Sequence, residues 1–408
     1  MLATLDRGIA GGRWYSLIDK LNRPDTLRAA FAQVAANRGA AGVDHVSIED
    51  YGANLDANLA RLSRSLLEGT YRPQAIRRHY IPKPGSAEKR PLGIPTVQDR
   101  VVQTALRMGI EPIFEKEFAE RSYGFRPHRG CKDALRRVDG LLGAGHVHVV
   151  DVDLKSYFDT IAKEPLLALV GERVSDGRIL ALVQAFLEQR VMEGLQEWTP
   201  EQGTPQGAVI SPLLSNIYLN PLDHLMAAEG FEMVRYADDF VVLCRSPEEA
   251  AAALAVVRDW TAQAGLQLHP EKTRLVDART DGFDFLGYRF QAGQRWPREK
   301  SLSKFKDTVR AKTKRTRGCS LERVITELNA TLRGWFEYFK HSRPWIFKML
   351  DGWIRRRLRS FLRKQQGWKG IAKVHGADHQ RWPNAFFDAH GLFSLQAAHG
   401  RACQSSRR

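Results

Sequence analysis

The alternation of apolar and polar positions in this chain predicts strands around a set of aspartates. Residues 233–244 contain two short β-prone runs on either side of Asp238 and Asp239, which predicts a hairpin with both carboxylates at its tip. Residues 147–154 also alternate, which predicts a strand that carries Asp153 near its end. If these strands are neighbours in one sheet, the three carboxylates meet at one point.

Helical periodicity, capping residues and glycines predict the remaining elements. Ser47 and Thr96 each begin a capping-box pattern. Ser211 is the predicted N-cap of a helix that has Pro212 at its first position. Extended segments are expected at 76–81 and 90–95, a second hairpin around 283–288, and helices at 13–38, 48–69, 97–109, 212–230, 248–264, 302–315, 320–340 and 344–366.

The order of these elements predicts an α+β fold rather than repeated βαβ units, and strands give way to basic helices near residue 292. The 408 residues carry a net charge of +16, and the segment from Arg295 to Lys373 contains 23 Lys and Arg against 6 Asp and Glu. A basic module attached to a nearly neutral one indicates a polyanionic partner. A membrane surface is the competing polyanion, but no basic helix has an uninterrupted apolar face.

The four cysteines lie far apart and form no CxxC pair. This spacing argues against a zinc module and a disulfide framework, and it is typical of a reducing compartment. The N-terminus has no apolar signal region, and no apolar run is long enough to span a membrane. We therefore expect a cytoplasmic protein that has no membrane partner.

Three converging carboxylates would offer the hard oxygen ligands that Mg²⁺ prefers. Two such ions serve in-line phosphoryl or nucleotidyl transfer, which is the chemistry expected for Asp153, Asp238 and Asp239. For Asp238 and Asp239 alone, the alternative is a pair of solvated turn aspartates. Their context in the chain favours the metal site.

Two further segments suit a nucleotide. Lys83 and Arg90 flank a turn that could place both cations over a triphosphate. The loop from Gly203 to Gly207 permits close backbone approach, and Gln206 can donate hydrogen bonds there. Either segment alone is more typical of a surface loop, but both occur in chain order with the three aspartates.

At this point the sequence resembles the reverse transcriptases encoded by group II introns. The resemblance runs in order through fingers, palm, thumb and tail, and implies a right-hand polymerase with an antiparallel sheet, followed by an α-helical thumb or maturase domain. The similar blocks are Arg90–Gln103, Ser122–Pro127, Asp153–Asp159, Gly203–Gly207 with Ser211–Leu219, Tyr236–Asp239, Gly265–Thr273, Phe285–Tyr288, Leu332–Phe339, Trp353–Leu358, Trp382–Phe387 and Gly391–Leu395. The implied domains are an N-terminal helical extension (1–60), fingers and palm (61–291), the basic thumb (292–376) and a tail (377–408).

The resemblance also implies roles for single residues. Asp153, Asp238 and Asp239 would hold two Mg²⁺ ions, for which Mn²⁺ is the expected substitute, and the carbonyl of Leu154 would complete one shell. Lys272 would donate a proton to pyrophosphate. The residues implied to bind the nucleotide are Lys83, Arg90, Phe158, Pro205, Gln206 and Gly207, with Phe158 excluding a 2′-hydroxyl.

Primer and RNA contacts are implied in the palm and the thumb. The alternative for Tyr157 and Phe158 is a core aromatic pair, and for the thumb a bundle with aromatic residues inside and solvated cations outside. The residues implied to contact nucleic acid are Tyr236, Ala237, Phe285, Leu286, Gly287, Lys312, Lys314, Arg315, Arg355, Arg356 and Arg357.

We therefore predict an RNA-directed DNA polymerase that binds group II intron RNA as a maturase in splicing and retromobility. Its expected partners are the intron RNA, an RNA template with a DNA or RNA primer, dNTPs and target DNA. A His/Cys-rich endonuclease module is missing from the sequence, so we expect no DNA cleavage by this polypeptide. The alternatives are an intron-free polymerase of the same lineage, acting in phage defence or repair, and a splicing cofactor without polymerase activity.

Overall fold

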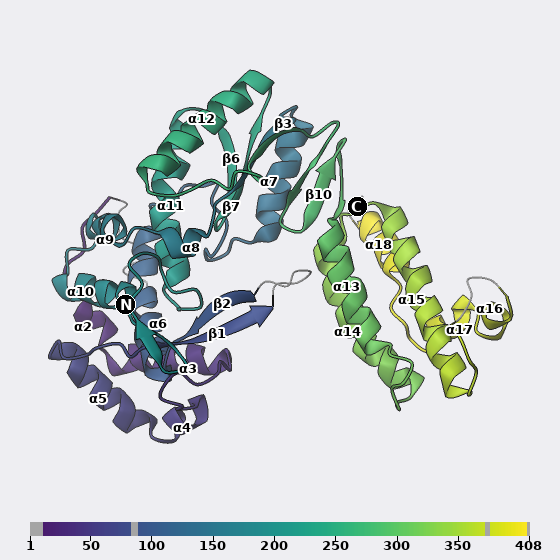
Figure 1. The fold of residues 1–408 in the computed structure, drawn as a ribbon, viewed down its shortest axis with the longest axis horizontal. Coiled ribbons are helices and arrows are strands. Elements are labelled where there is room, and N and C mark those ends of the chain that lie inside the picture. Colours follow the sequence, from purple (N-terminus) through teal and green to yellow (C-terminus); the bar gives the residue numbers. More distant parts are fainter. Residues whose placement is uncertain (1–10, 83–88, 372–375, 406–408) are drawn as a thin grey trace. The chain divides into compact units, whose positions relative to one another are not determined.

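The computed structural model describes residues 11–82, 89–371 and 376–405, and the chain divides into two compact units, Met1–Leu275 and Val276–Arg408 (Figure 1). Both units combine helices with antiparallel strands, in agreement with the predicted α+β class. The helices of the first unit are α2 (Ile18–Leu21), α3 (Pro24–Ala36), α4 (Ile48–Ala53), α5 (Leu55–Leu67), α6 (Val97–Phe114), α7 (Cys131–Gly143), α8 (Tyr157–Thr160), α9 (Lys163–Gly171), α10 (Gly177–Leu187), α11 (Ser211–Ala228) and α12 (Pro247–Gln263).

A four-stranded sheet in the order β6-β7-β3-β8 carries the aspartates. Helices α7, α11 and α12 pack against it. Val149 and Val150 are both fully buried, and because successive side chains point to opposite faces, both faces of the sheet are covered there. Its strands are β3 (His148–Asp153), β6 (Glu232–Tyr236), β7 (Asp239–Cys244) and β8 (Arg274–Asp277). The predicted strand and acidic hairpin are thus confirmed.

A second sheet has the order β2-β1-β4-β5. Its two longer strands correspond to the extended segments predicted at 76–81 and 90–95, and the structure pairs them as an antiparallel hairpin. The sequence did not reveal the two short strands, because three residues are too few to display an alternating pattern. The strands are β1 (Ile76–Pro82), β2 (Lys89–Ile94), β4 (Val191–Glu193), which runs parallel to β1, and β5 (Gln196–Trp198).

Several predicted helix boundaries were wrong. The helix expected at 13–38 is two helices, because Pro24 fits the first turn of a new helix but not a helix interior. The helix expected after Ser47 has its capping box, but it breaks at Asn54 into α4 and α5. The Thr96 hydroxyl accepts from the Asp99 amide, yet the helix continues to Phe114.

The N-cap of α11 lies one residue earlier than predicted. Ile210 occupies the cap position, so Ser211 is already the first residue of the helix. The Ser211 hydroxyl instead donates to the carbonyl of Pro205, at 2.9 Å. This bond fastens the preceding loop to the helix.

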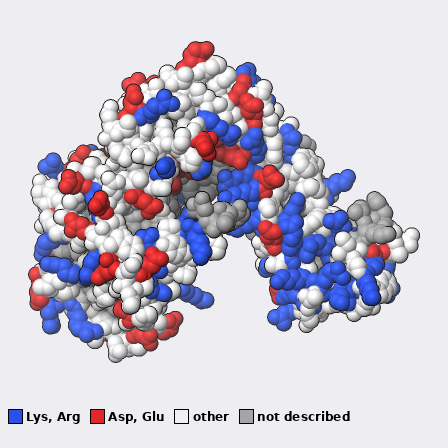
Figure 2. All heavy atoms as spheres, viewed as in Figure 1, with Lys and Arg blue, Asp and Glu red and all other residues white. Residues whose placement is uncertain are grey.

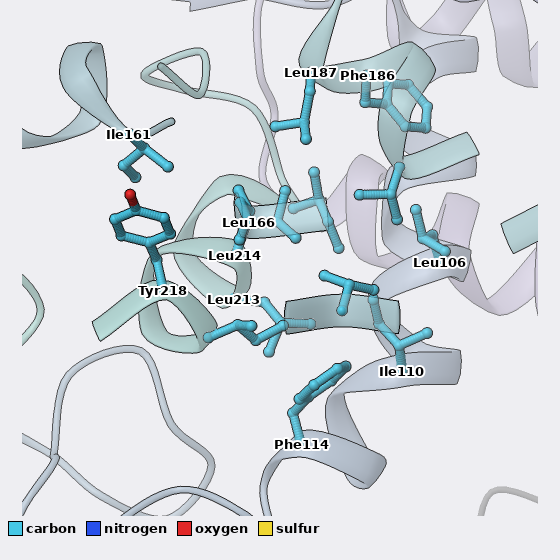
Figure 3. Packing of buried hydrophobic residues seen from close by; sticks show 14 of the residues in the cluster. Leu106, Ile110, Phe114, Ile161, Leu166, Phe186, Leu187, Leu213, Leu214 and Tyr218 are labelled. Carbon is cyan, nitrogen blue, oxygen red and sulfur yellow. The ribbon is translucent and has the colours of Figure 1, made fainter. Parts of the chain in front are cut away.

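The core of the first unit lies where several helices meet (Figure 3). Leu106 and Ile110 of α6 are fully buried there, as are Leu166 of α9 and Leu222 of α11. Each such side chain contributes about 1.5–3 kcal/mol through burial. These helices therefore form a rigid support for the sheet that carries the aspartates.

The second unit contains a three-stranded sheet and a helical bundle. Tyr288 joins them, because its ring packs 4.9 Å from that of Phe339 and its hydroxyl donates to the carbonyl of Tyr338. This packing explains why the unit begins before residue 292, where the composition changes. Its elements are β9 (Phe283–Phe285), β10 (Tyr288–Gln291), β11 (Gln294–Pro297), α13 (Glu299–Lys312), α14 (Leu321–Phe339), α15 (Pro344–Gln365), α16 (Ala377–Arg381), α17 (Asn384–Ala389) and α18 (Leu395–Ser405).

Candidate active site

The hairpin of β6 and β7 carries its two aspartates beside the end of β3. Asp239 lies directly opposite Asp153 in the antiparallel pairing, so their side chains lie on the same face of the sheet. Asp238 occupies the turn next to Ala237, whose φ of 58° is left-handed. The strand register thus brings all three carboxylates together at one end of strands β3 and β7.

The three carboxylates concentrate negative charge at this end of the strands. Burial raises the pKa of the Asp238 carboxyl, and the charge of Asp153 raises this pKa further. The ammonium of Lys272 lies 3.4 Å from the nearer carboxylate oxygen of Asp153 in a solvent-exposed pair. Within the described ranges, no three His, Cys, Asp or Glu side chains are already arranged as a metal site.

The carbonyl of Leu154 is oriented as a ligand would need to be. Leu154 forms an antiparallel bridge with Leu268, but the backbone bonds of that bridge use Asp153 and Lys155 on either side. In such a pair the central residue turns its amide and carbonyl away from the partner. Its carbonyl therefore points toward the β7 side of β3, where the turn that carries Asp238 lies.

Of the two predicted triphosphate cations, the structure describes one. Arg90 lies in β2, exposed, opposite Ile81 of β1. Its charge is near enough to lower the pKa of Asp238, against the larger effect of burial. Lys83 lies outside the described residues. Arg90 thus lies within electrostatic range of a predicted catalytic carboxylate.

A cavity of about 260 Å³ lies beside the Gly203–Gly207 loop and contains several predicted nucleotide-binding residues. Three backbone bonds hold the loop: Gly203 donates to the carbonyl of Ile161, Thr204 to that of Phe158, and Gly93 to that of Gln206. The lining residues are Ile76, Arg78, Pro91, Gly93, Phe158, Asp159, Leu187, Val191, Trp198, Pro200, Gln202, Gly203, Thr204, Pro205 and Gln206.

Gly207 allows the loop to lie close against β2. Its φ is +104°, and an added Cβ would lie 2.4 Å from the carbonyl oxygen of Gly93. Any larger residue would push the loop away from β2. Gly207 therefore shapes the backbone of the loop, whereas Phe158, Pro205 and Gln206 contribute side chains to the cavity wall.

The aromatic pair after Asp153 has divided roles. Tyr157 is a core residue whose buried hydroxyl donates to the carbonyl of Ser215, at 2.8 Å. Phe158 is half-buried, meets Tyr157 edge-on and lines the cavity. The alternative of a core residue is therefore correct for Tyr157. Phe158 packs against the core and lines the cavity, and its contact with a nucleotide stays a prediction.

Sequence reasoning missed an arginine–tryptophan pair in the cavity wall. The guanidinium of Arg78 lies over the Trp198 ring, 5.5 Å from its centroid, and both line the cavity. They come from β1 and from the end of β5, more than a hundred positions apart in the chain. Only the β1–β4 pairing brings them together, so no local pattern could have revealed them.

Tyr236 and Ala237 precede the aspartates. The Tyr236 ring packs against Phe125, and a hydrogen bond with Cys131, together with burial, raises the pKa of Tyr236 to about 12. Ala237 is buried, with 5% of its surface exposed. The half-buried Tyr236 ring is therefore better placed than Ala237 for a side-chain contact with nucleic acid.

Two family models cover most of the chain. One, described as reverse transcriptase (RNA-dependent DNA polymerase), matches residues 81–290, and the other, described as group II intron, maturase-specific domain, matches residues 302–382. The chain belongs to the group II intron reverse transcriptases. This membership confirms the family, the polymerase fold and the enzyme class predicted from the sequence.

Similar proteins agree with this family. Protein YkfC of Escherichia coli (strain K12) is 33% identical over 67% of this chain and 82% of its own length. The group II intron-encoded protein LtrA of Lactococcus lactis subsp. cremoris is 38% identical over 50% of this chain, which spans 34% of LtrA. A partial Cas6-RT-Cas1–Cas2 complex has a TM-score of 0.39 at 21% identity, over 61% of this chain and 41% of that one, too weak a likeness to bear on function.

The second unit of this reverse transcriptase contains the predicted primer segment, Phe285 to Gly287. The Phe285 side chain is fully buried and cannot contact a primer, whereas the Leu286 side chain is half-buried. The carbonyl of Leu286 already accepts from the Tyr338 hydroxyl, and that of Gly287 from Ser301. These bonds fix the turn on α14 and α13.

The maturase helices carry the basic residues, and Figure 2 shows Lys and Arg gathered over them on one face. Lys314 and Arg356 are exposed, whereas Arg315 and Arg355 are half-buried. The other two predicted RNA contacts also bond within the unit: Lys312 donates to the carbonyl of Glu327, and Arg357 to the hydroxyl of Thr313. Among the described helices, none is long and apolar enough to cross a bilayer.

Proposed function

We propose that this protein extends a primer 3′-hydroxyl with dNTPs on an RNA template by two-Mg²⁺ nucleotidyl transfer. The observation that carries the proposal is the register of β3 with β7, which sets Asp153 opposite Asp239 with Asp238 in the adjoining turn. Binding of intron RNA by the maturase helices would bring a structured template to this polymerase.

The donor chemistry of the site fits magnesium. Carboxylates and a main-chain carbonyl are hard oxygen ligands, and burial together with the neighbouring Asp153 makes the charge on Asp238 costly without a cation. Asp153, Asp238, Asp239 and the Leu154 carbonyl would hold two ions, which when bound neutralise charge on the attacking hydroxyl and the leaving pyrophosphate. Mn²⁺ has the same ligand preference and is the expected substitute.

The chain's own residues would bind and orient the nucleotide. Arg90 offers a planar fork to the triphosphate, alongside Lys83. Gln206 lies on the cavity wall, with its amide 3.4 Å from the carboxylate of Asp159. Phe158 presents a flat apolar surface where a ribose 2′-hydroxyl would otherwise fit.

Lys272 would act at the end of the reaction. Its ammonium lies beside Asp153, where it can give a proton to the departing pyrophosphate. Its proposed part is therefore that of a general acid rather than a binding group.

The maturase helices would hold intron RNA during splicing and retromobility, with target DNA as a further partner. Exposed cations and aromatic faces suit RNA, whose recognition relies on phosphate contacts and stacking. Intron RNA that co-purifies with the protein would support this role. An intron-free polymerase of the same lineage would lack such RNA.

The direct test is primer extension on an RNA template by an Asp238→Ala variant. We expect extension to fall by more than about 10³-fold, because a metal ligand is lost, while RNA binding stays within twofold of wild type. Asp25→Ala, which removes an exposed aspartate from α3, is the matched control and should extend normally. Unchanged extension by Asp238→Ala would overturn the metal assignment.

A further inference from the structure

Arg235 lies three residues before Asp238, in the strand that leads into the turn between β6 and β7 (Ala237–Asp238, here called the catalytic turn). Its side chain is completely buried. Burying a guanidinium is costly unless every donor finds an acceptor. Its Nε donates to one carboxylate oxygen of Asp223 at 2.7 Å, and Nη2 donates to the other. Nη1 donates to Asn216 Oδ1 at 3.0 Å and to the carbonyl of Ala237 at 2.9 Å. The hydrogen bonds of the Arg235 side chain therefore link α11 to the catalytic turn.

The turn that receives this bond is strained. Ala237 adopts a left-handed φ of 58°, which costs a residue with a Cβ roughly 1–2 kcal/mol. Such a conformation persists only where its surroundings impose it. The bond from Arg235 to the Ala237 carbonyl is one such restraint, made from the buried side of the hairpin.

A second restraint comes from the Ser122–Gly124 segment. A Cβ on Gly124 would lie 2.2 Å from the Ala237 amide nitrogen, so this backbone approaches the turn as closely as only glycine allows. The Asn216 amide donates to the carbonyl of Gly124 at 2.8 Å, and the Tyr123 amide donates to the carbonyl of Arg235 at 2.9 Å. One network therefore ties helix, segment and turn together.

We propose that Arg235, held by Asp223 and Asn216, is a positioning residue that fixes the turn so that Asp238 and Asp239 face Asp153. The inference rests on the proposed nucleotidyl transfer. The four hydrogen bonds of the Arg235 side chain end on Asp223, Asn216 and Ala237 rather than on the reacting carboxylates, although its charge, against the larger effect of burial, lowers the pKa of Asp238. The proposed nucleotide-binding residues lie on other elements. Loss of the restraint should therefore lower kcat and leave KM for dNTP unchanged, because small misplacements of reacting groups cost about 10²-fold.

The competing explanation is that the ion pair only stabilises the fold. Buried pairs are weak evidence for stability, because desolvation offsets much of their attraction. The chain offers a matched control in Arg126, which is 7% exposed, pairs with Glu115 at 2.7 Å and donates to the carbonyl of Ser122. Its hydrogen bonds reach the Ser122–Gly124 segment but not the turn itself, so a loss that comes only from weakening that segment would appear in both variants.

The test compares Arg235→Lys with Arg126→Lys in the full chain. Each keeps the charge and loses the planar fork. We expect Arg235→Lys to lower kcat for RNA-templated incorporation roughly 30- to 100-fold, with KM for dNTP within twofold, and Arg126→Lys to change kcat less than threefold. Equal losses in both variants, or an unchanged kcat in Arg235→Lys, would overturn the proposal.

Amide hydrogen exchange over residues 236–240, measured without substrates, gives a readout that does not need activity. Faster exchange there in Arg235→Lys but not in Arg126→Lys supports the proposal, and equal exchange overturns it. An inactive wild type would refute the proposed function, while the exchange comparison would still decide the role of Arg235.

A milder variant covers the case in which Arg235→Lys fails to fold. Asn216→Ala keeps the Arg235–Asp223 pair and removes one acceptor of Arg235 together with the bond to Gly124. We expect kcat to fall about tenfold with unchanged KM and faster exchange at 236–240. A folded Asn216→Ala protein with wild-type kcat and exchange would contradict the proposal.

Discussion

Arginines that are buried in the first unit contrast with exposed arginines that stack on aromatic rings in the second. Arg235 and Arg126 of the first unit are buried, and each forms an ion pair with a carboxylate. In the second unit, the guanidinium of Arg333 lies 4.9 Å from the ring centroid of Phe393, and that of Arg381 lies 4.7 Å from the ring centroid of Trp368. Both of these arginines are exposed.

This difference in surroundings matches the two proposed roles, which are catalysis in the first unit and RNA binding in the second. A carboxylate partner neutralises the charge of an arginine and fixes its geometry, which suits a residue that holds a catalytic turn. An aromatic face orients the guanidinium without cancelling its charge, which stays available to a polyanion. Ion pairs such as Arg310–Asp307 and Arg317–Glu327 also form in this unit, but the 6 acidic residues between Arg295 and Lys373 cannot neutralise the 23 basic ones. We propose that the remaining positive charge forms the binding surface for RNA.

The sharpest test of the first unit concerns its choice of nucleotide. We propose that Phe158 excludes a 2′-hydroxyl at the cavity wall, so Phe158→Ala should raise ribonucleotide incorporation roughly 10- to 100-fold relative to dNTP. Single-nucleotide extension with each substrate measures this ratio, and Tyr157→Phe, which trims a core hydroxyl, serves as the control. Unchanged discrimination by Phe158→Ala would reduce Phe158 to a packing residue.

The second unit should respond in RNA affinity. Arg356 is exposed, so Arg356→Glu should weaken RNA binding about tenfold and lower the slope of log K against log salt by about one. Arg64→Glu, on an exposed position of α5, is the control in the first unit. A salt slope identical to wild type would mean that Arg356 faces solvent in the complex. The comparison between the units would then fail.

The smallest expected effect is on stability in the first unit. Asp99 is buried, which raises its pKa to about 6 although the Tyr71 hydroxyl donates to it at 2.5 Å. Because the folded pKa lies above the unfolded value, this group favours folding below pH 4, and that contribution is lost as pH rises through 6.

Between pH 7 and pH 5 the free energy of unfolding should therefore gain about 1 kcal/mol from Asp99. Urea unfolding of wild type and of Asp99→Asn across this range measures it, since asparagine does not titrate. Parallel pH profiles in the two proteins would show that Asp99 does not carry the effect.

The sequence was sufficient to predict what local patterns encode. The acidic hairpin and the strand ending at Asp153 follow from alternation, and their chain order identified the family. Pairings set by the tertiary fold were not predictable. Asp223 and Arg235 come from a helix and a strand, and nothing in their own segments marks them as partners. Thumb arginines also looked alike until packing against Thr313 distinguished Arg357 from exposed neighbours.

The most direct test of the account measures RNA affinity and RNA-templated incorporation on one variant, Asp153→Asn. The substitution keeps the size of the side chain opposite Asp239 and removes its charge. We predict incorporation reduced by more than about 10³-fold, in Mg²⁺ and in Mn²⁺, with the Kd for RNA within twofold of wild type. Retained incorporation, or a loss of RNA binding equal to the loss of activity, would contradict the separation of chemistry from binding.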